Sequence, residues 1–205
     1  MSPLILLFLL FSLSVSISCG EYTTTCRSAG PIYVQYSYVI SVNSNGVAKK
    51  IVQFERQYTD SSCKKGHYLT FQTTYSPIPS TSLEEGYDLT YKSVTLTVED
   101  LSIFTSLGFS CSNKVKKGKP FSLTDNSCEQ AKLPYTTLYQ ESIGTTIEDV
   151  QFTVLDNGIR VMGMDASYSG IDGCATKIAL IVIISVVAVI IILLVAIVCC
   201  IKRKN

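Results

Sequence analysis

"IYVQYSYVISVNSNGVAKKIVQFERQY", residues 32–58, is the stretch that decides the fold. Polar and apolar residues alternate on both sides of a short polar segment, and this period of two is typical of β-strands with one buried face. Between the two runs lies Asn45-Gly46, a dipeptide that favours the tight turn of a β-hairpin. The stretch therefore predicts two antiparallel strands, Ile32–Val42 and Val47–Tyr58.

The same alternation continues along the chain. It predicts further strands at His67–Tyr75, Tyr87–Val98 and Pro134–Ile143, and a second hairpin around Asp156-Asn157-Gly158. Together these segments give about seven or eight antiparallel strands. An all-β domain of this kind closes its edges either as a barrel or as a sandwich.

Two segments interrupt the strand pattern. In "SPIPSTSLEEG", residues 76–86, Pro77 and Pro79 cannot donate to a strand ladder, so we expect a loop there. "EDLSIFTSLGF", residues 99–109, fits a short helix or another strand, and we favour an irregular strand or turn.

The ends of the chain predict a membrane topology. Residues 1–18 have the apolar stretch of a secretory signal peptide, and residues 177–201 are apolar enough to span a bilayer as one transmembrane α-helix. Lys202, Arg203 and Lys204 follow the apolar run, so residues 202–205 are expected to be a cytoplasmic tail. Residues 19–176 would then be an ectodomain at the plasma membrane, with the N-terminus extracellular and the C-terminus cytoplasmic. Cys199 and Cys200 would lie at the inner face, either as an S-palmitoylation site or as apolar residues that end the helix.

Six cysteines belong to the expected ectodomain if the signal peptide is cleaved after Ser18. They predict three disulfide bonds, which can pair in 15 ways; the cysteines are Cys19, Cys26, Cys63, Cys111, Cys128 and Cys174. A bond between Cys111 and Cys128 would close a lysine-rich loop.

Little in the sequence points to catalysis, a cofactor or a metal. His67 is the only histidine, in a predicted strand, and neither a nucleophile elbow, a phosphate-binding glycine loop nor a zinc-binding cysteine pattern is present. The chain has 17 Lys and Arg against 16 Asp and Glu, a near-neutral balance that argues against nucleic acid as a partner. The lysines between residues 114 and 119 fit either a solvated loop or a contact with an acidic glycan or lipid headgroup.

A known family shows a similar order of motifs. They run over about residues 21–164 as "EYTTTC", "YVQYSYVI", "VQFERQYTDSSC", "HYLTFQTTY", "YDLTYKSVTLTVEDL", "GFSC", "TDNSC" and "LPYTTLYQ". This order resembles the lipocalin-like extracellular domain of the adenomatosis-polyposis-coli down-regulated family of Wnt inhibitors. The resemblance places four cysteines at family positions, namely Cys26, Cys63, Cys111 and Cys128. The chain departs from the family in having one such domain instead of two, and Tyr22 where a tryptophan is typical.

The resemblance implies an all-β fold, an antiparallel lipocalin-like β-barrel with an apolar cavity, here followed by one transmembrane α-helix. We expect non-catalytic binding of an apolar or acylated ligand in that cavity. Alternation gives the candidate lining residues, which would be plain core in a filled sandwich: Val34, Tyr36, Tyr38, Phe54, Leu69, Phe71, Tyr91, Leu96, Phe152 and Val154. The alternative is an adhesion or recognition module that binds another extracellular protein through the loops Pro77–Gly86 and Asn113–Pro120.

Overall fold

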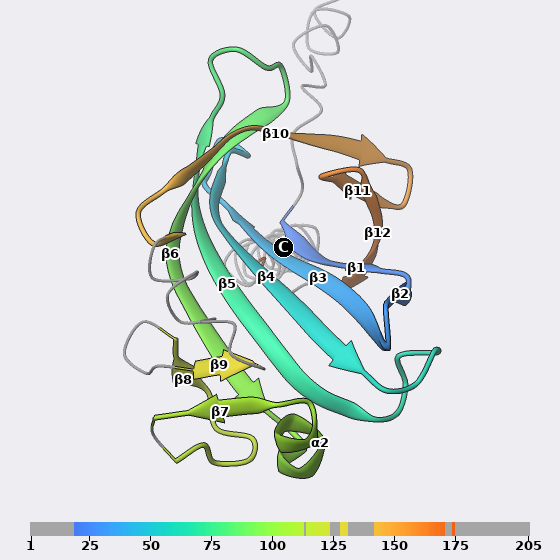
Figure 1. Cartoon of the computed structure of the whole chain (residues 1–205). Helices are drawn as coiled ribbons and strands as arrows, with labels where there is room; N and C mark the ends of the chain where they lie inside the picture. Colours follow the sequence, from blue (N-terminus) through green and yellow to red (C-terminus); the bar gives the residue numbers. More distant parts are fainter. Residues whose placement is uncertain (1–18, 113, 124–127, 131–141, 171–173, 175–205) are drawn as a thin grey trace, which may run out of the picture.

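Eight antiparallel strands form a closed ring in the computed structural model (Figure 1). The structure describes residues 19–112, 114–123, 128–130, 142–170 and 174. The ring strands, in chain order, are β1 (Gly20–Thr24), β3 (Ile32–Val42), β4 (Ala48–Tyr58), β5 (His67–Pro79), β6 (Gly86–Val98), β10 (Thr146–Leu155), β11 (Gly158–Val161) and β12 (Met164–Gly170). The prediction of an antiparallel all-β fold is confirmed at this level.

The short strand β1 closes the ring. It pairs on one side with β12 and on the other with β3, so that Tyr22 lies opposite both Tyr168 and Tyr38. The other neighbours follow the order β12-β11-β10-β6-β5-β4-β3. Because every ring strand then has two partners, the ring has no open edge along this path.

The hairpin predicted over residues 32–58 is present. Strands β3 and β4 pair from Tyr33 opposite Tyr58 to Val42 opposite Ala48. The side chain of Asn43 stabilises the turn, because its Oδ1 accepts hydrogen bonds from the amides of Asn45 (2.9 Å) and Val47 (3.0 Å).

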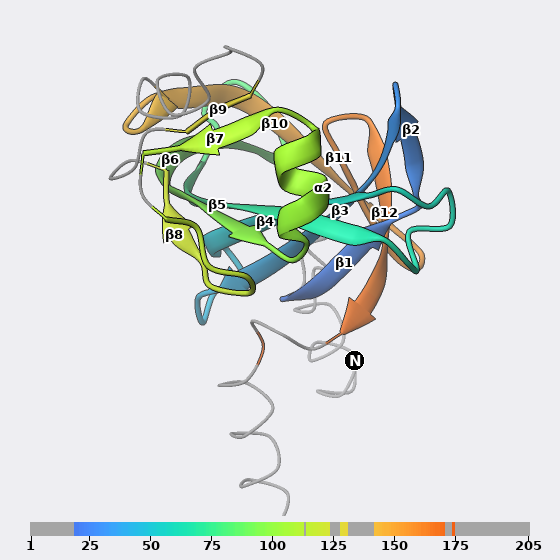
Figure 2. The ribbon, with the colours of Figure 1, turned by 60° about the horizontal axis from the view of Figure 1, so that its bottom comes forward.

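Strands β3 to β6 are longer than the ring and continue into a second, smaller unit. The extended part has its own edge strands, β2 (Arg27–Ala29) beside β3 and β8 (Phe121–Ser122) beside β6. Helix α2 (Leu101–Ser106) and the pair β7 (Phe109–Cys111) and β9 (Cys128–Gln130) lie at this end (Figures 1 and 2). The two ends of the molecule therefore differ, since one is the ring proper and the other is the α2 end.

The prolines of residues 76–86 do not end the strand, contrary to the expectation. β5 runs on through Pro77 and Pro79, which lie opposite Leu89 and Tyr87 of β6. The amide of Ser80 donates to the carbonyl of Gly86 (2.9 Å), so by alternation the nitrogens of both prolines are directed away from β6. The pairing of β5 with β4 stops at Tyr75, so no β4 carbonyl needs a donor there.

Residues 101–106 form a helix, which corrects the preference for an irregular strand or turn. Asp100 caps α2, because its Oδ1 accepts hydrogen bonds from the amides of Ser102 (2.9 Å) and Ile103 (3.1 Å). Phe104 of this helix is buried and stacks on Phe109 with ring centroids 4.7 Å apart. A cap and one buried anchor are thus enough to fix a helix of a turn and a half.

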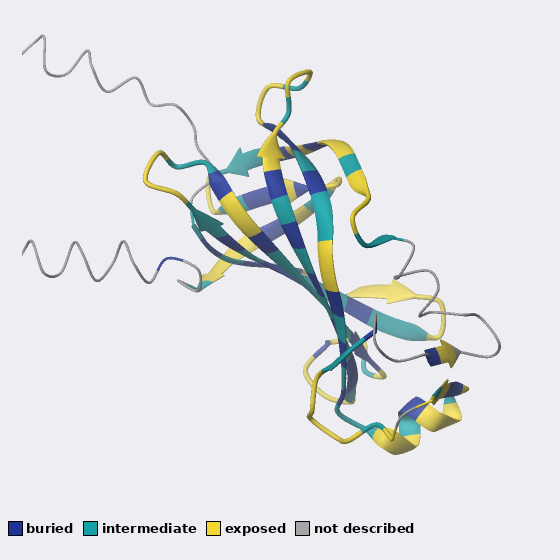
Figure 3. Cartoon of the chain, turned by 90° about the vertical axis from the view of Figure 1, so that its left-hand side faces the viewer, coloured by how far each residue is buried: buried dark blue, intermediate teal, exposed yellow. Residues whose placement is uncertain are grey.

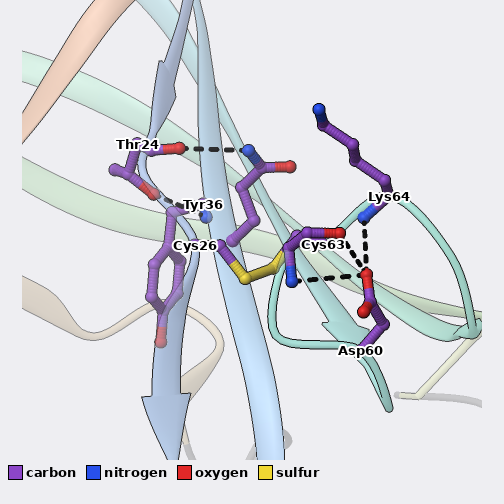
Figure 4. Close-up of a disulfide and its surroundings, with 8 residues drawn as sticks. Thr24, Cys26, Tyr36, Asp60, Cys63 and Lys64 are labelled. Carbon is purple, nitrogen blue, oxygen red and sulfur yellow. Dashed lines mark hydrogen bonds between the residues drawn. A yellow bond between two sulfur atoms is a disulfide. The ribbon is translucent and has the colours of Figure 1, made fainter.

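Three disulfide bonds join the six cysteines as Cys19–Cys174, Cys26–Cys63 and Cys111–Cys128. Figure 4 shows the second, which ties the chain after β1 to the loop between β4 and β5, where the amide of Cys63 donates to the carbonyl of Asp60 (3.1 Å). Three such bonds indicate an oxidising compartment, as for secreted or extracellular proteins.

In the described part of the chain, none of the helices has the length and apolar character needed to cross a membrane. The signal peptide at residues 1–18, the transmembrane helix at 177–201, the tail at 202–205 and the palmitoylation candidates Cys199 and Cys200 all lie outside the described residues. So does the strand expected at Pro134–Ile143, except for its last two residues.

Candidate functional site

The inner face of the ring is defined by one buried cluster to which all eight ring strands contribute. Its members are Tyr22, Tyr38, Ile40, Ala48, Ile51, Tyr75, Tyr87, Leu89, Val150, Phe152, Ile159, Val161 and Ala166. A second buried cluster on the same face of β5 and β6 lies towards the α2 end, and includes Leu69, Phe71, Val94, Leu96, Val98, Phe104, Phe109 and Leu123. Figure 3 shows the buried residues recurring along the curved strands and again beside α2.

The candidate lining residues divide between these clusters. Tyr38 and Phe152 belong to the ring cluster, and Tyr36 and Tyr91 pack against it half-buried. Three others belong to the α2-end cluster, namely Leu69, Phe71 and Leu96. Val34 is buried on the same face as Tyr36 but in neither cluster, and Val154 is half-buried opposite the buried Ile159.

Phe54 is the exception, because the register puts it on the outer face. Ile51 lies opposite the buried Ile40, so from Ile51 to Gln57 the inward residues of β4 carry odd numbers, and Phe54 pairs with Ser37 instead. On the outer face the Arg56 guanidinium lies 5.2 Å from the centroid of the Phe54 ring. Phe54 is therefore removed from the lining set.

The inward residues of β4 are instead polar for three positions in succession. Gln53, Glu55 and Gln57, which we call the inner polar row, follow Ile51 on the inner face. Their cross-strand partners are Tyr38, Tyr36 and Val34 on β3, and Thr73, Phe71 and Leu69 on β5. The row lies where the ring cluster gives way to the α2-end cluster, so polar atoms separate the two apolar regions.

Hydrogen bonds hold the inner polar row in a definite orientation. Tyr75 donates its hydroxyl proton to Gln53 Oε1 (2.9 Å), and Tyr68 donates to Gln57 Oε1 (2.8 Å). Gln57 in turn donates through Nε2 to Glu55 Oε1 (2.8 Å). Each glutamine oxygen is thus oriented by a tyrosine, while the glutamine amides also carry N–H donors, so Glu55, when ionised, is the one member of the row that only accepts.

Glu55 is a carboxylate without an ion-pair partner among the described residues. Burial raises the pKa of Glu55, and the hydrogen bond from Gln57 opposes that rise. Among the described residues, the only ion pair within 4 Å is the exposed pair of Arg160 and Asp165, so Glu55 makes none. An ionised Glu55 on this face therefore carries an uncompensated desolvation cost.

Tyr38 is the second unusual group of this face. Its side chain is 2% exposed, and its hydroxyl makes no hydrogen bond to any described residue. Burial is the main reason that the pKa of Tyr38 is raised, and the neighbouring Tyr36 adds to it. A buried hydroxyl without a partner destabilises the folded state, because it gives up the hydrogen bonds that it makes to water in the unfolded chain.

Replacing Glu55 by glutamine should stabilise the protein at neutral pH. A raised pKa in the folded state makes wild-type stability fall as pH rises above 4.5, the ordinary glutamate pKa, through the raised value, and E55Q lacks this penalty. We therefore expect E55Q to be more stable than wild type at pH 7, and the difference to vanish below pH 4. Urea unfolding of both proteins from pH 4 to 8 measures it, and a difference that does not change with pH would contradict it.

Replacing Tyr38 by phenylalanine removes only the hydroxyl without a partner. We expect Y38F to be more stable than wild type by about 1 kcal/mol, because the ring keeps its packing and the desolvation cost disappears. Tyr75→Phe is the matched control, since the Tyr75 hydroxyl donates to Gln53 and its loss should destabilise. Urea midpoints of the two variants should therefore move in opposite directions; a Y38F midpoint below that of wild type would show that the hydroxyl has a partner in solution.

Among the described residues, no group of three or more histidine, cysteine, aspartate or glutamate side chains is placed to hold a metal ion. His67 stacks against Tyr58 with ring centroids 5.1 Å apart, and its Nε2 lies 2.8 Å from Thr70 Oγ1. Burial lowers the pKa of His67. These contacts give the His67 side chain a packing partner and a hydrogen-bond partner within its own part of the sheet.

An open groove of about 470 Å³ lies on the outer surface beside β10 and β11. It is lined by Ile147, Glu148, Asp149, Val150, Gln151, Thr153, Arg160, Met162 and Gly163. Asp149 also accepts hydrogen bonds from Ser80 (2.5 Å) and Ser82, which fixes the turn between β5 and β6 against β10. One of the two loops expected to contact a partner thus borders a groove, whereas the other, Asn113–Pro120, lies at the α2 end and its Asn113 is outside the described residues.

No family model matches this chain, and no curated protein is similar to it in sequence. What the structure defines is a class, a disulfide-bonded protein whose antiparallel sheet closes into a barrel-like ring of eight strands.

Proposed function

We propose that this chain is a non-catalytic binding protein that takes an apolar or acylated ligand into the interior of a lipocalin-like ring. The closed ring of eight strands carries the proposal, because rings of about this size have an interior that can hold one small ligand. Aromatic and aliphatic side chains line that face, and Tyr36 and Tyr91 are only half-buried there. Such partly filled apolar surface is what an acyl chain or a sterol would cover.

The setting that we propose is the cell surface. The disulfides fit an extracellular ring, and the apolar residues 177–201 with the basic residues after them fit a single-pass type I anchor. A tag placed after Asn205 should be detected only after cells are permeabilised, whereas an antibody to the ring should bind intact cells.

The test uses residues 19–176, secreted in oxidised form. A native mass spectrum followed by lipid extraction should reveal a stoichiometric fatty acyl or sterol species, or uptake when lipids are added back. A bare mass with no uptake would refute the ligand proposal.

The second candidate is a recognition module for another extracellular protein. It is favoured by the groove beside β10 and by Ile78, which is 59% exposed just before the fixed β5–β6 turn. Ile78→Asp should then abolish binding of the ring to partner-bearing cells without changing its stability, whereas lipid binding in the interior should not respond to this change.

A further inference from the structure

Ionisable side chains are rare on the inner face of the ring, as far as the structure describes it. Among the register-paired inward residues of the eight ring strands that the structure describes, Glu55 is the only ionisable acid or base besides the tyrosines. Arg27 of the edge strand β2 lies opposite Val34, so it projects from the same face of the sheet, and it is exposed. Its charge lowers the pKa of Tyr36 and of Tyr38. Arg27 makes no ion pair with Glu55, so among the described residues the carboxylate has no salt-bridge partner within 4 Å.

The hydrogen-bond capacity around Glu55 is also unfilled on the acceptor side. Glu55 Oε1 accepts from Gln57, but within the described residues no donor is recorded for Oε2. Gln53 Oε1 and Gln57 Oε1 each accept one tyrosine hydroxyl and retain a second lone pair. The Tyr38 hydroxyl has no partner at all among described residues. The unfilled acceptor capacity is therefore centred on Glu55, with the glutamine amide N–H groups as donors beside it.

These groups are close enough to act on one ligand atom. Tyr36 lies directly opposite Glu55, and Tyr38 lies opposite Gln53 on the adjacent inward row. Side chains at directly opposed and diagonal positions of one sheet face are separated by about 4.5–8 Å, which a single small polar group can bridge. Burial is the main reason that the pKa of Tyr36 and of Tyr38 is raised; the charge of Glu55 adds to the rise at both tyrosines, and the charge of Arg27 opposes it.

We propose that the inner polar row binds the protonated amine of an amphiphilic ligand whose apolar part lies against the neighbouring clusters. An ammonium group matches the row on three counts: it has one positive charge, it has three N–H donors and no acceptor, and it is attracted to the faces of tyrosine rings. A carboxylate or sulfate head would be repelled by Glu55, and a hydroxyl head has only one proton to donate. This inference rests on the proposed function, since it names the head of a ligand held in the ring.

The location of the inner polar row allows one ligand to contact both the row and an apolar cluster. The row separates the ring cluster from the α2-end cluster, so a head bound at Glu55 leaves a chain free to lie against Ile51 and Tyr75 or against Phe71 and Leu96. Binding an ammonium would also give Glu55 the counter-charge that it lacks. The group that costs stability in the empty ring is therefore the group that selects the ligand.

The experiment compares three photoreactive probes with the same 12-carbon chain and a diazirine, differing only in the head: primary amine, alcohol or carboxylate. The full chain is held in lipid nanodiscs, and saturable labelling is measured on the peptides of β3 to β6 by mass spectrometry. The variants are Glu55→Gln, Tyr38→Phe, and Glu84→Gln as the matched control, because Glu84 is an exposed carboxylate on the β5–β6 turn. Each probe partitions into the nanodisc bilayer to the same extent for every variant, so this partitioning does not affect the comparison of a variant with wild type.

We expect wild type and E84Q to label with the amine at roughly 10- to 100-fold lower concentration than with the alcohol, the range of a charge-assisted hydrogen bond. E55Q should lose this preference and keep the labelling by the alcohol, and Y38F should reduce the preference several-fold. Equal labelling by amine and alcohol, a preference for the carboxylate, or an unchanged preference in E55Q would overturn the inference while leaving the proposed function standing. Saturable labelling by none of the three probes would overturn the proposed function and this inference with it.

Discussion

A chain that lacks both Cys19 and Cys174 is expected to lose about 5 kcal/mol of stability, the largest effect of any disulfide in this protein. The bond joins residues separated by 155 positions, whereas Cys111–Cys128 spans 17. In the loop-entropy model the long cross-link restricts the unfolded chain more, and the short bond contributes about 3 kcal/mol. The ring itself should still close, because β1 pairs with β12 and β3 through backbone hydrogen bonds.

Urea unfolding under oxidising conditions measures both losses, with Cys19→Ala/Cys174→Ala compared with Cys111→Ala/Cys128→Ala. The second double variant is the matched control, since it also removes two sulfur atoms and one cross-link. Equal losses, or a smaller loss for the long cross-link, would contradict the expectation and show that the contribution of these disulfides does not follow the length of the loop that each one closes.

Replacing Phe152 by alanine should cost about 3–5 kcal/mol, the usual range for a phenylalanine removed from a packed core. Phe152 is 1% exposed in the ring cluster and meets the Tyr87 ring edge to face, with centroids 5.6 Å apart. Phe54→Ala is the matched control on the outer face, because it removes a half-buried ring and its contact with Arg56. Its expected cost is about 1 kcal/mol.

The comparison tests the register of the ring directly. If Phe54 faced the interior, as its apolar character alone would indicate, the two alanine variants would lose similar amounts of stability. If Phe152→Ala does not fold, Phe152→Leu gives a smaller cavity and an expected loss of about 1 kcal/mol, measured by the same urea titration. A Phe54→Ala loss equal to that of Phe152→Ala would contradict the inward polar row.

The strands of the β3–β4 hairpin could be predicted from the sequence because their signals are local. Alternation and Asn45-Gly46 fix the strands and the turn without any distant residue. The cap of α2 was equally local, since Asp100 precedes the helix, but the short apolar run "SIF" also fits a strand. Burial of Phe104 against Phe109, a tertiary contact, decides between them.

The candidate site was harder to predict for a physical reason. Alternation divides β4 into two faces but does not say which one is inside, and polarity normally assigns Gln53 and Glu55 to solvent. The register with β3, set by Ile40 opposite Ile51, reverses that assignment. The closure of the ring by β1 could not be predicted from the sequence either. Gly20–Thr24 is too short to show a hydrophobic period, and it pairs with residues almost 150 positions away.

The position of β1 between two partners has a mechanical consequence. Cys19 is joined to Cys174, so a pull on the chain beyond Cys174 reaches the first residue of β1 as well as the end of β12. β1 passes that load to β3 through its second row of hydrogen bonds. Tension applied at the C-terminal side is thus shared between strands on both sides of the closure, and no single strand can be peeled away from the ring by itself.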